Sequence, residues 1–261
     1  MEKLGYKVID CHAHVGRIPG RVGYVVTGDD LDFVLKSEGV SFALASSASV
    51  TTVGQKFGNA EAVREVGKHL DTVGGMVWIN PHDPSWEEDA EATLAHGFLG
   101  VKLHPTFDLY KVGVESLGSV FSFAVKHGLS ILTHAMEREA SPSNYAELLE
   151  RYPDVKVVFA HFGPEVDGIL MAKQYDNAYL DTTLTPPSKV AVAVTCAGSG
   201  KVLFGTDSPL GYKTKDGPDK PEYRTFRRAT DEIIKLGLRE AELEDVFYRN
   251  SIKVFSIRLK K

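Results

Sequence analysis

Short runs of consecutive apolar residues alternate along the chain with longer segments in which apolar residues recur every three or four positions. The short runs, such as Val-Val-Phe-Ala at 157–160, are typical of parallel strands that are covered on both faces. We predict eight strands, at 7–14, 42–47, 72–80, 98–104, 130–135, 156–161, 178–183 and 201–206.

The segments between these runs have the spacing of helices that bury one face. Near residue 30, Leu31, Val34 and Leu35 keep this spacing, and Gly39 ends the pattern. The predicted helices cover 29–39, 60–70, 89–96, 117–128, 145–149, 169–175, 189–197, 223–236 and 240–255.

Strands that alternate regularly with helices predict the α/β class and a (β/α)8 TIM barrel, as one domain over 1–261. A doubly wound open sheet is the alternative, and it usually has a glycine-rich turn after its first strand. Here the first strand ends in His-Ala-His-Val-Gly. This turn favours the barrel.

Composition excludes several classes of protein. The 261 residues are 43% hydrophobic and 25% charged, which is ordinary for a globular protein, and the net charge of −5 argues against a nucleic-acid binder. Two cysteines cannot build a disulfide framework or a cysteine-rich zinc module. No apolar signal segment and no run of ~18 apolar residues occurs. We expect a cytoplasmic protein that acts on a small molecule and has no membrane partner.

Polar residues with metal-binding or proton-transfer chemistry stand where the predicted strands end. Active sites of (β/α)8 barrels lie at the carboxyl ends of the strands, so we expect these side chains to converge. Strand alternation also predicts that those of the first strand point the same way. The residues are Asp10, His12 and His14 on the first strand, Lys102 and His104 on 98–104, His134, His161, and Asp207 after 201–206.

Imidazole and carboxylate ligands suit zinc and other divalent metals. Three imidazoles and one carboxylate leave a position open for water, as in catalytic sites. A single histidine on an apolar strand is more often a hydrogen-bonded core residue. Because five histidines recur at strand ends, a metal site is favoured, with Zn²⁺ as the expected ion and one ion per chain.

The strings IDCHAH at 9–14, FAHFG at 159–163 and FGTDSP at 204–209 resemble the amidohydrolase superfamily. Within it they are most similar to the amidohydrolase-2 branch, which includes aminocarboxymuconate-semialdehyde-type decarboxylases and related hydrolases. The order of the motifs extends this resemblance over the whole chain. It does not specify a substrate, and a homodimer is a family-level expectation only.

The resemblance implies a role for each strand-end residue. His161 would be an acid/base beside the metal, and Asp10 would orient a histidine ligand. The metal ligands would be His12, His14, His134 and Asp207.

These roles imply a hydrolase in which a metal-activated water attacks an amide, lactone or ester carbonyl. In it Asp207 would accept a proton and His161 would shuttle one. A metal-dependent decarboxylase or other lyase acting on an unsaturated or aromatic acid is the alternative. A non-catalytic ligand-binding barrel is a third hypothesis.

Lys102 lies in the string VKLHP, which resembles the site of a carboxylated lysine that bridges two metals. In that case His134 and His161 would bind a second metal. The alternative is a cationic lysine that binds a substrate carboxylate or pairs with an acidic residue, and the AHFG string favours it. His104 points the same way by strand period, and it could contact the substrate or simply line the upper part of the barrel.

Loop residues are weaker candidates. Arg17 and Tyr212, in the loops after the first and last strands, would suit a carboxylate-bearing substrate, although simple solvation is the favoured explanation for each side chain. Cys11 is predicted to point outward toward the helices, and Trp78 is assigned to packing.

Overall fold

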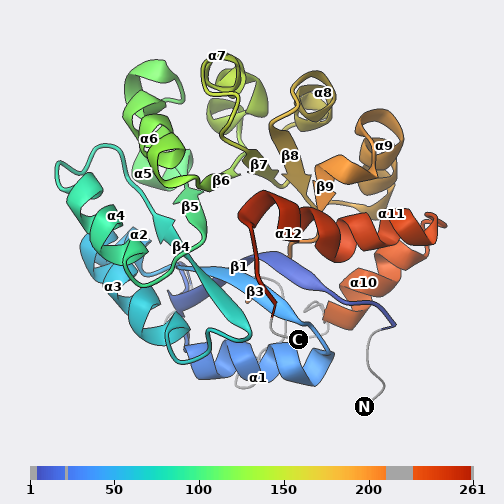
Figure 1. Ribbon diagram of the computed structural model, residues 1–261, viewed down its shortest axis with the longest axis horizontal. Helices are drawn as coiled ribbons and strands as arrows, with labels where there is room; N and C mark the ends of the chain where they lie inside the picture. Colours follow the sequence, from blue (N-terminus) through green and yellow to red (C-terminus); the bar gives the residue numbers. More distant parts are fainter. Residues whose placement is uncertain (1–4, 21–22, 210–225, 260–261) are drawn as a thin grey trace.

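Eight parallel strands form a ring at the centre of the computed structural model, which describes residues 5–20, 23–209 and 226–259 (Figure 1). A two-residue strand, β2 (Val25–Val26), pairs antiparallel with the end of the first strand. The ring is formed by β1 (Ile9–Arg17), β3 (Phe42–Ser47), β4 (Val73–Trp78), β5 (Gly100–Leu103), β6 (Ser130–His134), β7 (Val157–Ala160), β8 (Ala178–Asp181) and β9 (Val202–Leu203). The eight predicted strands are therefore confirmed.

Backbone hydrogen bonds between β1 and the segment after β9 close the ring. Cys11 N donates to Phe204 O at 2.9 Å, and Asp207 N donates to His12 O at 2.7 Å. Ala13 and Ser208 form a parallel bridge. Closure confirms the barrel and excludes the doubly wound alternative, because an open sheet leaves its edge strands unpaired.

Helices surround the ring on its outside (Figure 1). The first begins at the N-cap Thr27, whose side chain exchanges hydrogen bonds with Asp30, and it ends at Gly39, which has a φ of 79°. The predicted helix at 223–236 begins outside the described residues. The α-helices are α1 (Gly28–Glu38), α2 (Val50–Val53), α3 (Gln55–Val66), α4 (Trp86–Leu94), α5 (Pro105–Asp108), α6 (Val114–His127), α7 (Ala146–Arg151), α8 (Asp167–Gln174), α9 (Pro187–Ala197), α10 (Phe226–Ile234), α11 (Glu240–Glu244) and α12 (Asn250–Phe255).

Two apolar layers hold this architecture together. The larger lies between the strands and the surrounding helices. The smaller fills the inside of the ring, where Phe255 and Ile257 from the C-terminal segment pack on Met76 and Leu132. In Figure 1, α12 crosses the near end of the ring. This layer closes one end of the barrel, so a ligand must enter from the other.

Cys11 belongs to the inner layer, and the prediction that it points outward is wrong. The pairing of β1 with β3 shifts register between Asp10 and Ala13. Such an irregularity breaks the strict alternation of side chains along a strand. The neighbouring residues Cys11 and His12 therefore both face the inside of the ring.

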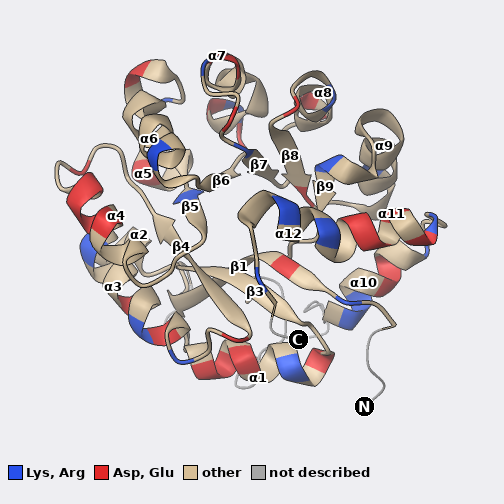
Figure 2. Cartoon of the chain, viewed as in Figure 1, with Lys and Arg blue, Asp and Glu red and all other residues tan. Residues whose placement is uncertain are grey.

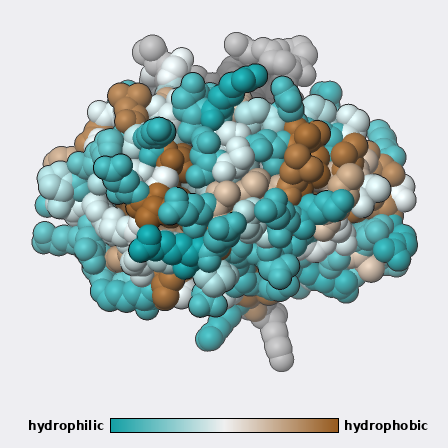
Figure 3. All heavy atoms as spheres, turned by 90° about the horizontal axis from the view of Figure 1, so that it is seen from above, coloured by the Kyte–Doolittle hydropathy of each residue, from teal (hydrophilic) through white to brown (hydrophobic). Residues whose placement is uncertain are grey.

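Charged residues concentrate on the outer helices, while the strands of the ring are largely uncharged (Figure 2). The side of the molecule in Figure 3 is mostly hydrophilic, with separate hydrophobic groups among the teal residues. Among the described residues, none of the helices has the length and apolar character needed to cross a membrane.

Candidate metal centre

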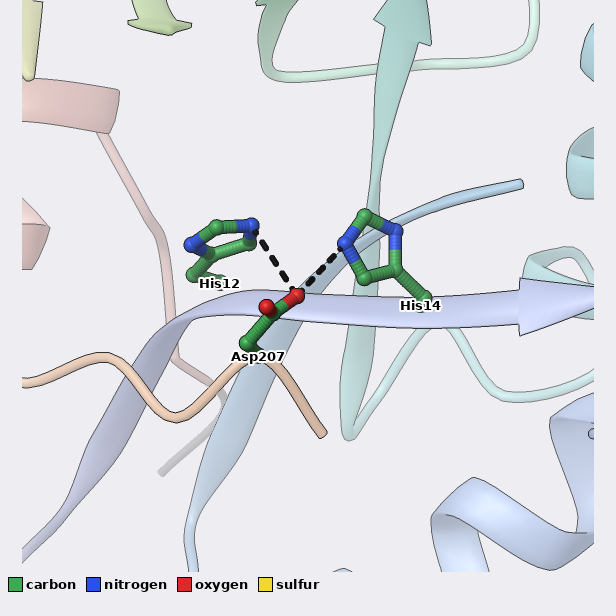
Figure 4. A group of neighbouring side chains, drawn as sticks. All are labelled: His12, His14 and Asp207. Carbon is green, nitrogen blue, oxygen red and sulfur yellow. Dashed lines mark ion pairs between the residues drawn. The ribbon is translucent and has the colours of Figure 1, made fainter. Parts of the chain in front are cut away.

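His12, His14 and Asp207 point toward one another (Figure 4). All three line one cavity and are at most 6% exposed, which places them at its closed end. The Asp207 Oδ1 atom lies 2.9 Å from His14 Nε2 and 3.4 Å from His12 Nε2. One ligand atom from each residue lies within 4.8 Å of the other two. β1 supplies both imidazoles, and the segment after β9 supplies the carboxylate, so barrel closure assembles the group.

Each imidazole is held through its other nitrogen. His12 Nδ1 lies 2.9 Å from Asp181 Oδ2, and His14 Nδ1 lies 3.1 Å from Ser46 Oγ. A carboxylate can only accept, so His12 Nδ1 carries the proton and Nε2 keeps its lone pair. Outer hydrogen bonds of this kind orient histidine ligands in metal sites.

The ionisation of the group also fits a divalent metal. Burial, with Lys102 nearby, holds the pKa of His12 well below its usual range, so the ring is neutral. Burial alone would raise the pKa of Asp207, but His12 and His14 outweigh it and hold the pKa well below its ordinary value. Neutral imidazole and ionised carboxylate are the forms that bind metal. The buried group is therefore consistent with a divalent metal ion.

Lys102 lies at the same closed end and is 1% exposed. Its Nζ atom is 2.8 Å from His12 Nε2. Burial lowers the pKa of Lys102 to about 8. A metal ion on His12 Nε2 would take the position of this hydrogen bond, so metal binding requires Lys102 Nζ to move away.

Three further histidines form one wall of the cavity. The rings of His104 and His134 stack with centroids 3.9 Å apart, and His161 meets His134 edge-on at 4.8 Å. His134 Nε2 is hydrogen-bonded to Glu137, which leaves Nδ1 as the free nitrogen of the His134 ring. His161 Nδ1 donates to Thr183 O at 3.3 Å, so its Nε2 keeps the lone pair.

Two residues of the site have backbone conformations that are rare for residues other than glycine. His161 has a φ of 66° and Asp207 has a φ of 60°. Left-handed conformations of residues other than glycine are costly and cluster at functional sites. The hydrogen bonds around both residues maintain a conformation that aims each side chain into the cavity.

The cavity has a volume of about 330 Å³, and seven of the predicted residues line it. Arg17, at the end of β1, is exposed and is not among the residues that line the cavity. Tyr212 lies outside the described residues. The seven lining residues are His12, His14, Lys102, His104, His134, His161 and Asp207.

Asp10 supports the site differently from the prediction. Its carboxylate accepts from the backbone N–H of His12 and from the N–H and hydroxyl of Thr206. Burial raises the pKa of Asp10 to about 8. It contacts no imidazole, because the register shift in β1 turns it toward the segment after β9. Asp10 therefore ties together the backbones that carry His12 and Asp207.

Asp181 does for His12 what was predicted of Asp10, and the sequence analysis missed it. It is fully buried at the end of β8, and it also accepts from the backbone N–H groups of His161 and Thr183. The signal was present, since Asp181 is another polar residue at the end of an apolar run.

The sequence analysis also missed Trp78 and Glu137. Trp78 lines the cavity and stacks on His104, with rings 5.7 Å apart and nearly parallel. Glu137 lines it from the segment after β6. No local pattern distinguishes this glutamate from the exposed Glu139 two residues later.

Comparison with solved structures shows the same fold in proteins of low identity. A 5-carboxyvanillate decarboxylase from Sphingomonas paucimobilis is 15% identical, with a TM-score of 0.74, over 97% of this chain and 99% of that one. A probable 2-pyrone-4,6-dicarboxylic acid hydrolase from Acinetobacter baumannii is 16% identical, with a TM-score of 0.69, over 97% and 100%. A 4-oxalomesaconate hydratase from Rhodopseudomonas palustris is 14% identical, with a TM-score of 0.68, over 95% of each chain.

A comparison with curated protein sequences finds no match. A family model described as amidohydrolase matches residues 9–257, nearly the whole chain and all of the strands that carry the site. The protein therefore belongs to the amidohydrolase-2 family of barrel enzymes, and its buried His12, His14 and Asp207 group is consistent with a divalent-metal site.

Proposed function

We propose that this protein is a metal-dependent hydrolase that cleaves an amide, lactone or ester of a small molecule. The observation that carries the proposal is the Asp207 carboxylate, which lies between His12 Nε2 and His14 Nε2 at the closed end of a cavity of about 330 Å³. A bound divalent metal lowers the pKa of water toward neutrality and supplies the nucleophile. Zn²⁺ is the ion we expect.

The residues of the site divide the remaining work. His12, His14 and Asp207 would hold the metal, with His134 as a fourth ligand through Nδ1. Asp207 would also accept a proton from water. His161 lines the same cavity with a free Nε2, so it can hold or pass a proton at the substrate carbonyl. Lys102 and His104 would contact the substrate.

Metal analysis followed by a substrate panel tests this proposal. We expect about one equivalent of divalent metal and turnover of a member of an amide, lactone and ester panel. Asp207→Asn and His161→Asn should each reduce kcat at least ~100-fold, and asparagine tolerates the left-handed backbone at both positions. The matched control is His96→Asn, on an exposed histidine. Unchanged turnover in both site variants would refute the proposal.

A decarboxylase is the second candidate, and Lys102 favours it. A cation at the closed end of the cavity, beside His12, can hold the carboxylate of an unsaturated or aromatic acid. The structural relatives include a decarboxylase. Release of CO₂ from a panel of such acids, abolished by Lys102→Met, would support this candidate over hydrolysis.

Carboxylation of Lys102 would make the site binuclear, with His134 and His161 as ligands of a second ion. Two equivalents of metal in protein prepared with bicarbonate, falling to one in Lys102→Met, would support that arrangement. One equivalent in both preparations supports the mononuclear site. Neither result depends on knowing the substrate.

A further inference from the structure

The mouth of the cavity is apolar. Phe107, Met136 and Leu184 line it and are 51%, 44% and 46% exposed. Phe107 lies in α5, which follows β5, and Met136 and Leu184 lie in the segments that follow β6 and β8. Large apolar side chains left half-exposed around a cavity are typical of ligand contacts, because covering them with an apolar ligand removes them from water.

The charges along the cavity are distributed unevenly. Of the described residues that line it, the only lysine or arginine is Lys102, and it is buried at the closed end. Near the mouth lies Glu137, with a side chain that is 39% exposed. Its Oε2 atom accepts from Thr106 Oγ1 and from His134 Nε2, each at 2.8 Å. A fixed negative charge therefore stands among apolar side chains.

An anionic group that reached the mouth would lie near Glu137, and none of the described residues that line the cavity there is a lysine or an arginine. It would also lose its hydrating water on contact with the apolar side chains of the mouth. Repulsion by Glu137 and this loss of hydration both weaken the binding of a negatively charged outer group, and an apolar outer group has neither cost. The closed end differs, because Lys102 and the predicted metal there can accept an anionic or strongly polar group.

We propose that the site selects substrates whose outer part is apolar and uncharged, with Glu137 and the apolar mouth enforcing the choice. This inference rests on the proposed function, because the reacting group must bind at the closed end. It makes Glu137 a specificity-determining residue. The substrates would carry at most one acidic group, at the reacting end.

A matched pair of metal-binding probes tests this selection by calorimetry on the metal-loaded protein. The probes are 4-isopropylbenzohydroxamic acid and 4-carboxybenzohydroxamic acid, which share the chelating group and differ in a substituent of similar size. We expect the isopropyl probe to bind at least ~10-fold more tightly, which corresponds to about 1.4 kcal/mol.

Variants separate the charge of Glu137 from its contact with His134. Glu137→Gln removes the negative charge but keeps an oxygen that accepts from Thr106 and His134. Because the charge is gone, the ratio of the two probe affinities should fall at least threefold. A change in His134 alone would weaken both probes equally and leave the ratio unchanged. Glu139→Gln, on the exposed neighbour, is the control.

The apolar mouth has its own pair of variants. Met136→Ala should weaken the isopropyl probe about threefold and leave the carboxylate probe unaffected. Leu170→Ala removes a side chain that is 56% exposed and does not line the cavity, and it should change neither affinity.

Equal affinity of both probes for the wild type, or a ratio unmoved by Glu137→Gln, would overturn this inference and leave the proposed function standing. Failure of metal-loaded protein to bind either probe would overturn both. A carboxylate probe that binds more tightly would show that the outer part of the substrate is anionic.

Discussion

Replacement of Asp181 by asparagine should weaken metal binding without unfolding the protein. In the wild type, Asp181 Oδ2 accepts from His12 Nδ1, and Oδ1 accepts from the backbone N–H groups of Thr183 and His161. Asparagine keeps one acceptor oxygen for the two backbone groups and turns its amide NH₂ toward His12. Because an NH₂ group only donates, His12 Nδ1 must then accept.

The consequence appears at Nε2, the other nitrogen of the His12 imidazole. With Nδ1 accepting, the proton of a neutral His12 moves to Nε2, the atom that lies 3.4 Å from Asp207 Oδ1. A protonated nitrogen cannot bind metal. Changes to such outer hydrogen bonds typically cost 10–100-fold in metal affinity, which corresponds to about 1.4–2.8 kcal/mol. We expect a loss in this range.

The assay is titration of metal-free protein with Zn²⁺ in competition with a chromophoric chelator. Nitrogen-15 spectra of the histidines provide a second readout, because they distinguish the two tautomers of His12. Asp176→Asn, at an exposed position just before β8, is the matched control. A folded Asp181→Asn protein with metal affinity within threefold of the wild type and an unchanged His12 tautomer would refute the reasoning.

Three other predictions concern stability. Burial raises the pKa of Asp108 from 3.8 to about 6, despite the hydrogen bond from Trp78, so wild-type stability should fall as pH rises from about 4 to 6. Asp108→Asn lacks this dependence, so its free energy of unfolding relative to that of the wild type should rise by at most roughly 3 kcal/mol between pH 4 and 7. The same difference between the two proteins in urea unfolding at both pH values would contradict this prediction. Phe255→Ala, in the apolar layer that closes the barrel, should cost about 3–5 kcal/mol in urea unfolding, and a loss under 1 kcal/mol would show that α12 packs loosely. Removing metal with a chelator should lower Tm by about 5–10 °C, because ligand at 100 times Kd adds about 2.7 kcal/mol; an unchanged Tm in protein shown to hold metal would count against the site.

The arrangement of strands and helices could be predicted closely. Runs such as Val157–Ala160 are apolar at every position, because strands of a closed parallel ring are buried on both faces. The last strand was predicted too long: 201–206 became β9 (Val202–Leu203). Beyond it the backbone turns to present Asp207, whose φ of 60° no strand has. The pattern of apolar residues does not report this turn.

The convergence of His12, His14 and Asp207 could also be predicted, because all carboxyl ends of parallel strands meet at one end of a barrel. The partners of these residues could not. Asp181 lies 169 positions from His12, and Lys102 lies 90 positions from it. Which strand ends touch depends on the stagger of the closed ring, and that is a property of the whole sheet.

The sequence by itself determined the barrel, its end of entry and the residue types of the candidate metal centre. These follow from local periodicity and from the position of polar residues after apolar runs. Only the tertiary structure decided that Asp181 rather than Asp10 holds the His12 ring, that Cys11 faces inward, and that Glu137 stands at the mouth. The physical reason is that a register shift in β1 and contacts across the ring of strands set the directions of these side chains. Neither produces a periodic pattern in the sequence.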